Sequence, residues 1–316
     1  MIFNILLLII GFIILIKSAD VFVDSASDIA SYFKISKMII GLTIVAFGTS
    51  APEFAVSVKS MMSGSKDIVL GNVIGSNILN ILLILGLSSL FHPLTVKSNT
   101  VKKEIPITML ITSLLIVLMS DKLFQPGLKN TLSRGDGISI LLFFLIFIYY
   151  LVNQMRNKKE TEENETKKNL LISIILTVLG IVGIVLGSNF VVNSSSYLAK
   201  AFGVSEKMIA LTIVALGTSL PELVTSVIAT KKGSYDIAIG NIVGSNIFNI
   251  GVVLGIPLSI FGGMSNYTIN VIDLLTLFIA TTLLFIFAYT NKKINKFEGL
   301  FFLLIFVVYY SYVVFA

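Results

Sequence analysis

Long apolar runs of about 20 residues recur along the whole chain, separated by short polar segments. A run of this length with few charges is long enough to cross a bilayer as one α-helix. The first run lacks the basic start and the small-residue cleavage site of a signal peptide, so we expect it to be a retained helix. The pattern predicts ten spanning helices, at residues 1–17, 38–58, 68–90, 105–120, 137–152, 170–192, 208–230, 237–261, 268–290 and 297–315.

The composition strengthens this interpretation. The chain is 55% hydrophobic and only 13% charged, with a mean hydropathy of +0.96, whereas soluble domains carry about 25% charged residues. Soluble enzymes and nucleic-acid-binding proteins are therefore excluded, and the expected surroundings are a lipid bilayer. With no cysteine and one histidine, the chain has no basis for a disulfide or a thiolate or histidine metal centre, and we expect no cofactor.

The distribution of basic residues predicts the orientation. If the chain starts outside, sixteen Lys and Arg residues fall on the inner side and seven on the outer side. The positive-inside rule therefore favours a multi-pass protein of the cell membrane with both termini outside. One long polar connection, residues 153–169, reads as a cytoplasmic linker between two halves of five spans each, residues 1–152 and 170–316.

An internal repeat relates the two halves. Residues 36–86 align without gaps on residues 205–255, with 28 of 51 positions identical. Because each half has an odd number of spans, the two copies enter the membrane from opposite sides. Inverted repeats of this kind are typical of secondary transporters, whose site lies near the midplane between the repeats. The predicted fold is thus an all-α membrane protein of ten transmembrane helices in two inverted five-helix repeats.

Glu53 and Glu222, at equivalent positions of the repeat, are the acids deepest in the predicted spans. A carboxylate at that depth is costly unless it is paired or neutralised. The spans offer no Lys or Arg partner, so a bound cation is the simplest compensation. Calcium fits, because it takes 6–8 oxygen ligands. Thr49 and Thr218 precede the glutamates by four residues and share their helix faces.

Further oxygens follow the same repeat. Ser76 with Asn80, and Ser245 with Asn249, are also i and i+4 pairs that can face the cavity. Pro52 and Pro221 cannot donate to the carbonyl four residues back, which frees it as a ligand. Two G-x-x-x-G pairs are expected to let helices approach closely, and four further asparagines are interpreted as helix–helix hydrogen bonders. These residues are Gly71, Gly75, Gly240, Gly244, Asn72, Asn77, Asn241 and Asn246.

The repeated G-T-S-x-P-E and G-N-x-x-G-S-N blocks resemble those of the calcium/cation antiporter superfamily, specifically prokaryotic sodium/calcium exchangers. The resemblance implies alternating-access exchange of Ca²⁺ for Na⁺, with four clustered ion positions. Calcium would bind Glu53, Glu222 and the backbone oxygens of Thr49 and Thr218. The remaining implied ligands are the Ala46 carbonyl with Ser76 for one sodium, the Ala215 carbonyl with Ser245 for its mirror, Asn80 and Asn249 in the middle, and Ser50 and Ser219 facing the pathway.

One departure bears on stoichiometry. Some sodium/calcium exchangers carry Asp at the position of Asn249, but both copies here are Asn. The fixed charge is then that of two glutamates, which one Ca²⁺ balances and three Na⁺ exceed by one. Potassium dependence is not expected.

Three alternatives remain beside Na⁺/Ca²⁺ exchange. A proton/calcium antiporter on the same fold would be driven by a pH gradient. A cation channel would conduct without a counter-ion, but the sequence has no repeated filter loop. An intramembrane enzyme is not supported, since no Ser/His pair or paired membrane aspartates occur. No obligatory protein partner is implied.

Overall fold

The structure, a computed structural model, describes residues 1–124, 130–157, 169–204, 213, 215–265, 267 and 270–315. Its first half contains α1 (Ile2–Phe33), α2 (Lys37–Ile40), π-helix η1 (Gly41–Val45), α3 (Ala46–Thr49), α4 (Ala51–Met62), α5 (Lys66–Leu79), η2 (Asn80–Leu85), α6 (Gly86–Phe91), β1 (Leu94–Thr95), η3 (Thr100–Glu104), α7 (Ile105–Met119), α8 (Asp121–Phe124), β2 (Thr131–Leu132) and α9 (Arg134–Asn157). Its second half contains α10 (Leu170–Ala201), α12 (Ala215–Thr218), α13 (Leu220–Lys231), α14 (Tyr235–Phe248), η5 (Asn249–Leu254), α15 (Gly255–Phe261), β3 (Met264–Ser265), α16 (Val271–Asn291), β4 (Lys293–Ile294) and α17 (Lys296–Phe315).

The predicted spans fall on these helices. Within the described residues, seven helical runs are long and apolar enough to cross a membrane, and the bent pair of residues 37–49 and 51–62 makes an eighth. The predicted span 105–120 corresponds to α7, which is only 15 residues long. The predicted span 208–230 corresponds to α12 and α13, and its start lies outside the described residues.

The first and sixth helices extend furthest beyond their predicted spans, because they are longer than their apolar runs. α1 continues from residue 17 to Phe33, and α10 continues from residue 192 to Ala201. In α1 the added length carries Asp20, Asp24 and Asp28. Their spacing of four places all three on one face, so the helix continues with a polar stripe. Of the predicted linker 153–169, residues 158–168 lie outside the described residues.

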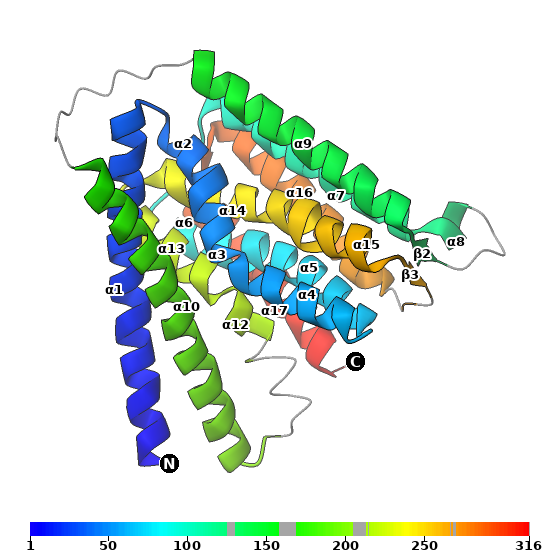
Figure 1. Cartoon of the computed structure of the whole chain (residues 1–316), viewed down its shortest axis with the longest axis horizontal. Coiled ribbons are helices and arrows are strands. Elements are labelled where there is room, and N and C mark those ends of the chain that lie inside the picture. Colours follow the sequence, from blue (N-terminus) through cyan, green and yellow to red (C-terminus); the bar gives the residue numbers. More distant parts are fainter. Residues whose placement is uncertain are drawn as a thin grey trace.

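Burial divides the helices into a core and a periphery. In an 18-residue apolar stretch of each run, 94% of the residues are buried for α14 to α15 and 72% for α5 to α6, whereas only 17% are buried in the corresponding stretches of α1 and α17. Figure 1 shows α1 and α10 together at one side, with the other long helices crossing obliquely beside them. Apolar helices that are exposed on most of their surface are suited to lipid contact. The repeated blocks therefore form the centre of the molecule.

The helices α1 and α10 pack along each other through glycines. A side chain at Gly187 would place its Cβ 2.7 Å from the backbone nitrogen of Leu15, and one at Gly180 would place it 2.8 Å from Cβ of Phe22. Such distances are closer than atoms can approach without displacement. Direct backbone contact of this kind indicates that α1 and α10 form one tightly packed pair.

Lys232 connects the helix pair α1 and α10 to the core through α1. The Lys232 ammonium, in the turn between α13 and α14, lies 2.7 Å from Asp20 Oδ1 and 2.8 Å from Asp24 Oδ1. It also donates a 2.9 Å hydrogen bond to the Asp20 carbonyl. A repeat offset of 169 residues places Ser63 opposite Lys232, and Asn189 and Asn193 opposite the two aspartates. The second copy of this contact therefore has no charges.

Two short antiparallel sheets join the halves. Leu94 of β1 pairs with Ile294 of β4, and Leu132 of β2 pairs with Met264 of β3. Each sheet thus connects a loop of the first half with a loop of the second half.

Candidate ion-binding site

The two glutamates lie at matching breaks in their helices. Glu53 is in the first turn of α4, and Glu222 is in the first turn of α13. The axis bends by 47° between α3 and α4, next to Pro52, whose ring cannot continue the helix without a break. Each glutamate has only 1% of its surface exposed. The breaks therefore place two carboxylates inside the protein at helix N-termini, which favour negative charge.

At each of these carboxylates, a serine from the other half of the chain lies within contact distance. The Ser50 hydroxyl, from the first half, donates a 2.9 Å hydrogen bond to Glu222 Oε1 in the second half. The Ser219 hydroxyl lies 3.4 Å from both Glu53 Oε1 and Ser76 Oγ. Within the described part of the chain, no Lys or Arg pairs with either glutamate. The two carboxylates are also near enough to repel one another.

A group of four asparagines holds two amide oxygens toward the interior. Asn80 Nδ2 donates to Asn246 Oδ1 at 2.9 Å, and Asn249 Nδ2 donates to Asn77 Oδ1 at 3.1 Å. Asn77 and Asn246 also donate to each other's carbonyls, both at 3.3 Å. The amide nitrogens of Asn80 and Asn249 are therefore occupied, while their Oδ1 atoms are buried without a partner.

These oxygens form part of a larger set of buried oxygens that lack a donor. The helix α4 packs against η5, which begins with Asn249, and α13 packs against η2, which begins with Asn80. On these elements and the neighbouring α14, the described buried oxygens without a partner are Glu53 Oε2, Glu222 Oε2, Asn80 Oδ1, Asn249 Oδ1, Thr225 Oγ1 and Ser245 Oγ. Buried acceptors are normally satisfied. An all-oxygen set of this kind, with two negative charges, has the chemistry of a site for a hard cation.

The other predicted ligands lie around the same breaks. The Thr49 hydroxyl is 2.9 Å from Asn241 Oδ1 and 3.1 Å from the Val45 carbonyl, and it also lies close to the Glu222 carboxylate. The Thr218 hydroxyl lies close to Glu53. The Ala46 carbonyl accepts a 3.0 Å hydrogen bond from the Ser50 amide.

Some predicted ligands are described only in part. Ala215 is the first residue of α12, but its side chain lies outside the described part of the structure. The structure brings the described parts of the predicted ligand set together, while ion binding itself stays a prediction.

The prediction that four asparagines bond helices together is confirmed. Besides Asn77 and Asn246, Asn72 Nδ2 donates to the Glu53 carbonyl at 3.0 Å, and Asn241 Nδ2 donates to Ser226 Oγ at 2.9 Å. Close packing is also confirmed for Gly240 and Gly244. A Cβ on Gly240 would lie 2.9 Å from Gly41 Cα, and one on Gly244 would lie 2.8 Å from Leu42 Cα.

Gly71 and Gly75 have fewer neighbours among the described residues than their counterparts have. Neither meets a described atom within 4 Å of its would-be Cβ. The repeat would place residues 207, 210, 211 and 215 against them, and residues 205–212 and the side chain at 215 lie outside the described part of the structure. Their packing role therefore stays a prediction.

Residues 3–153 and 172–315 match the family described as sodium/calcium exchanger protein, which is most of the chain. The chain belongs to the sodium/calcium exchanger family. This exchanger is a multi-pass membrane protein, in agreement with its long apolar helices.

Relatives of this exchanger match over nearly its full length. It is 32% identical to the sodium/calcium exchanger MaX1 of Methanosarcina acetivorans over 344 residues, covering 97% of each chain. It is 38% identical to the inner membrane protein YrbG of Escherichia coli over 267 residues, covering 81% of this chain and 80% of YrbG. It is also similar to a structure of the sodium-calcium exchanger NCX_Mj soaked with 10 mM Na⁺ and no Ca²⁺, with a TM-score of 0.84, 33% identity and 98% of each chain covered.

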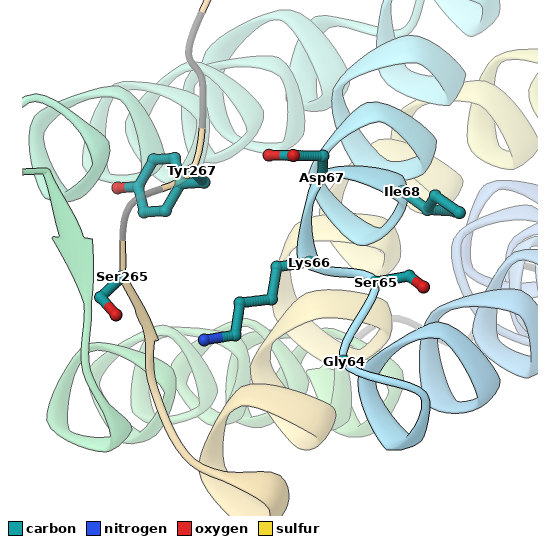
Figure 2. Close-up of a pocket in the computed structure, with 7 residues that line it drawn as sticks. All are labelled: Gly64, Ser65, Lys66, Asp67, Ile68, Ser265 and Tyr267. Carbon is teal, nitrogen blue, oxygen red and sulfur yellow. The ribbon is translucent and has the colours of Figure 1, made fainter.

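The exchanger also has a cavity away from the glutamates. It has a volume of about 440 Å³ and lies between the α4–α5 turn and residues Ser265 and Tyr267. Figure 2 shows Lys66 and Asp67 pointing toward that side and Ile68 pointing away. The cavity is lined by none of the predicted ion ligands.

Sequence reasoning missed one buried acid of the exchanger. Glu104 ends η3 and has no exposed surface. In the sequence it follows Lys102 and Lys103 at the edge of a predicted span, where a solvated position is the usual expectation. The neighbouring Pro106 and the apolar run after it carry no signal that would have marked its burial.

Proposed function

We propose that this protein exchanges Ca²⁺ for Na⁺ by alternating access, with Glu53 and Glu222 as the shared ion ligands. The observation that supports this most directly is the set of buried oxygens without donors around two carboxylates that have no basic partner in the described part of the chain. One Ca²⁺ neutralises two carboxylates. Neutral oxygens come from the side chains of Asn80, Asn249 and Ser245. The remaining ion ligands in this proposal are the backbone carbonyls of Thr49, Thr218, Ala46 and Ala215 and the hydroxyl groups of Ser76, Ser50 and Ser219.

Exchange follows from competition for these ligands. Calcium and sodium require the same carboxylates, so they cannot occupy the site together. An empty site would leave two repelling charges buried, and the cost of removing their hydration opposes closure. Loaded forms lack this penalty and can cross. The coupling thus prevents leak in either direction.

The moving unit in this proposal is the pair α1 and α10. Their glycine-mediated contact lets them move as one body, while the repeated blocks keep the ligands in place. Residues 1–152 and 170–316 form the two inverted halves, with both termini outside and residues 153–169 on the cytoplasmic side.

The test is uptake of radiolabelled calcium into proteoliposomes, with sodium, potassium or proton gradients imposed separately. We expect uptake driven by the sodium gradient, and its loss in Glu53→Gln and in Glu222→Gln. Glu298→Gln is the matched control, since the Glu298 carboxylate lies in the first turn of α17 and accepts a hydrogen bond from the Asn295 amide at 2.7 Å. Uptake driven by protons alone would replace sodium as the coupling ion, and abundant uptake by either glutamine variant would refute the assigned roles.

A further inference from the structure

Among the described residues, a third carboxylate is buried without a basic partner, in addition to Glu53 and Glu222. Glu104 has no exposed surface. Tyr150 of α9 donates a hydrogen bond to its Oε1 atom, but its Oε2 atom is buried and has no partner. One neutral hydroxyl does not balance a buried negative charge, and an uncompensated charge in the interior costs several kcal/mol or more. The site therefore calls for a positive ion.

A cavity of about 160 Å³ adjoins this carboxylate. Its lining residues come from the start of α2, the connection into η3 and the end of α9, and they are Ser36, Met38, Lys97, Ser98, Asn99, Thr100, Glu104 and Gln154. Gln154 Oε1 is, like Glu104 Oε2, buried without a hydrogen-bond donor. Two acceptors of the same kind, one of them charged, thus line one space together with three hydroxyl groups.

The nearby lysines are engaged elsewhere. Lys97 lines the cavity, but its ammonium forms an ion pair with Asp236 Oδ2 at 2.8 Å. The Lys103 ammonium lies 5.6 Å from the centre of the Tyr150 ring, a cation–π contact. Among the described residues that line the cavity, Glu104 is the one acid.

We propose that this cavity binds a sodium ion through Glu104 Oε2 and Gln154 Oε1, with hydroxyl groups of the lining and water completing its shell. The ligands are all oxygens, which selects a hard cation. A single carboxylate matches a single positive charge, whereas calcium sites usually recruit several carboxylates. Water alone would satisfy the two acceptors but would leave the charge of Glu104 uncompensated.

The position of this ion gives it a structural effect on the transport helices. Ser36 caps α2 by accepting a hydrogen bond from the Ile39 amide at 3.4 Å. The α2–η1–α3 run leads from there to Thr49 and Ser50. An ion held between Glu104 and Gln154 would tie η3 to α9 beside the start of this run. The inference does not depend on which ions are exchanged at Glu53 and Glu222.

The experiment measures equilibrium binding of radiolabelled sodium to the purified full chain. The background is the Glu53→Gln/Glu222→Gln double variant, which removes the charges of the main site. We expect saturable binding of one sodium per chain, competed by unlabelled sodium more strongly than by potassium. Adding Glu104→Gln or Gln154→Leu should weaken the affinity about tenfold or more, whereas adding Glu298→Gln should leave it unchanged.

A gain of function separates loss of the ligand from loss of the fold. Gln154→Glu adds a second carboxylate to the cavity and should shift its preference toward calcium. Absence of saturable sodium binding in the background variant would overturn the proposal. So would binding that survives Glu104→Gln, or a failure of Gln154→Glu to raise calcium affinity in a monodisperse preparation. Because the main site is silenced in every sample, none of these outcomes bears on the exchange activity.

Discussion

Removing the contact between Lys232 and α1 should loosen the helix pair α1 and α10 from the core. We consider Lys232→Met, which keeps the length of the side chain but removes its charge. The Lys232 side chain is 26% exposed, and those of Asp20 and Asp24 are 49% and 59% exposed. The contact is thus partly solvated and belongs with surface ion pairs rather than with buried ones.

The size of the effect follows from this exposure. Partly exposed ion pairs contribute about 0.2–1 kcal/mol each, and the hydrogen bond to the Asp20 carbonyl adds a similar amount. We therefore expect a total of about 1–2 kcal/mol for the contact. This corresponds to a change of about 5–30-fold in the equilibrium between closed and open arrangements of α1.

Hydrogen exchange measures this equilibrium directly, because amides that are protected by the contact exchange through its opening. We expect amides near Asp20, Asp24 and the α13–α14 turn to exchange about 5–30-fold faster in Lys232→Met. The matched control is Lys231→Met, which removes the neighbouring charge. The Lys231 ammonium lies 4.4 Å from the centre of the Phe91 ring, which belongs to α6 and not to α1. Equal acceleration in both variants, or acceleration throughout the chain, would refute the reasoning.

The same contact predicts how the effect of Lys232→Met varies with salt and with pH. Partial burial would lower the pKa of Lys232, but hydrogen bonds to Asp20 and Asp24 and the charges of these carboxylates outweigh it. The pKa is thus raised above its ordinary 10.5. A raised pKa means that this stabilisation is fully present below 10.5 and is lost as the pH rises through the higher, folded-state value. The difference in exchange between Lys232→Met and the parent should therefore be the same at pH 7 and pH 9, but smaller in high salt.

Two further pairs of variants test packing and ligand roles. Gly240→Ala should lower the melting temperature in detergent, at a cost of about 1–3 kcal/mol, because its Cβ would meet Gly41. Gly135→Ala, whose Cβ would lie 3.4 Å from the Ser133 hydroxyl, should be neutral or stabilising, and equal losses in both variants would contradict the packing argument. Asn80→Ala should weaken calcium binding about tenfold or more, since it removes an oxygen that lacks a donor. Asn72→Ala removes hydrogen bonds to the Glu53 carbonyl and to Ser57. It should lower stability by about 1–3 kcal/mol and affect calcium affinity less than Asn80→Ala does. The reverse ranking, measured by calcium titration and thermal unfolding, would disprove the roles assigned to Asn80 and Asn72.

The repeated blocks made the centre of the molecule predictable from sequence. Glu53 and Glu222 stood out because equivalent positions of an inverted repeat must lie in equivalent environments. The i and i+4 spacings then predicted which side chains share a face with them. The contacts between halves could not be predicted in this way, since the bond from Ser50 to Glu222 depends on how two separate helix breaks meet.

Buried charge outside the repeat was harder to predict. Glu104 follows two lysines, and it is buried through contacts with other elements, which include the hydrogen bond from Tyr150 of α9. The length of α1 was underestimated because three aspartates interrupt its hydrophobicity but not its helical period. Lys232 and Asp20 are 212 positions apart in the sequence, and no local sequence pattern predicts their contact.

The reciprocal bonding of the serines and glutamates bears on how such a protein can arise and diverge. Ser50 donates a hydrogen bond to Glu222, and Ser219 lies beside Glu53, so one half alone does not contain a complete set of ligands. A shorter ancestor with a single copy would have to assemble from two molecules inserted in opposite directions. Fusion of the two copies into one chain removes the need for them to be identical. Lys232 of the α13–α14 turn, where the other copy has Ser63, is a difference of the kind that fusion permits.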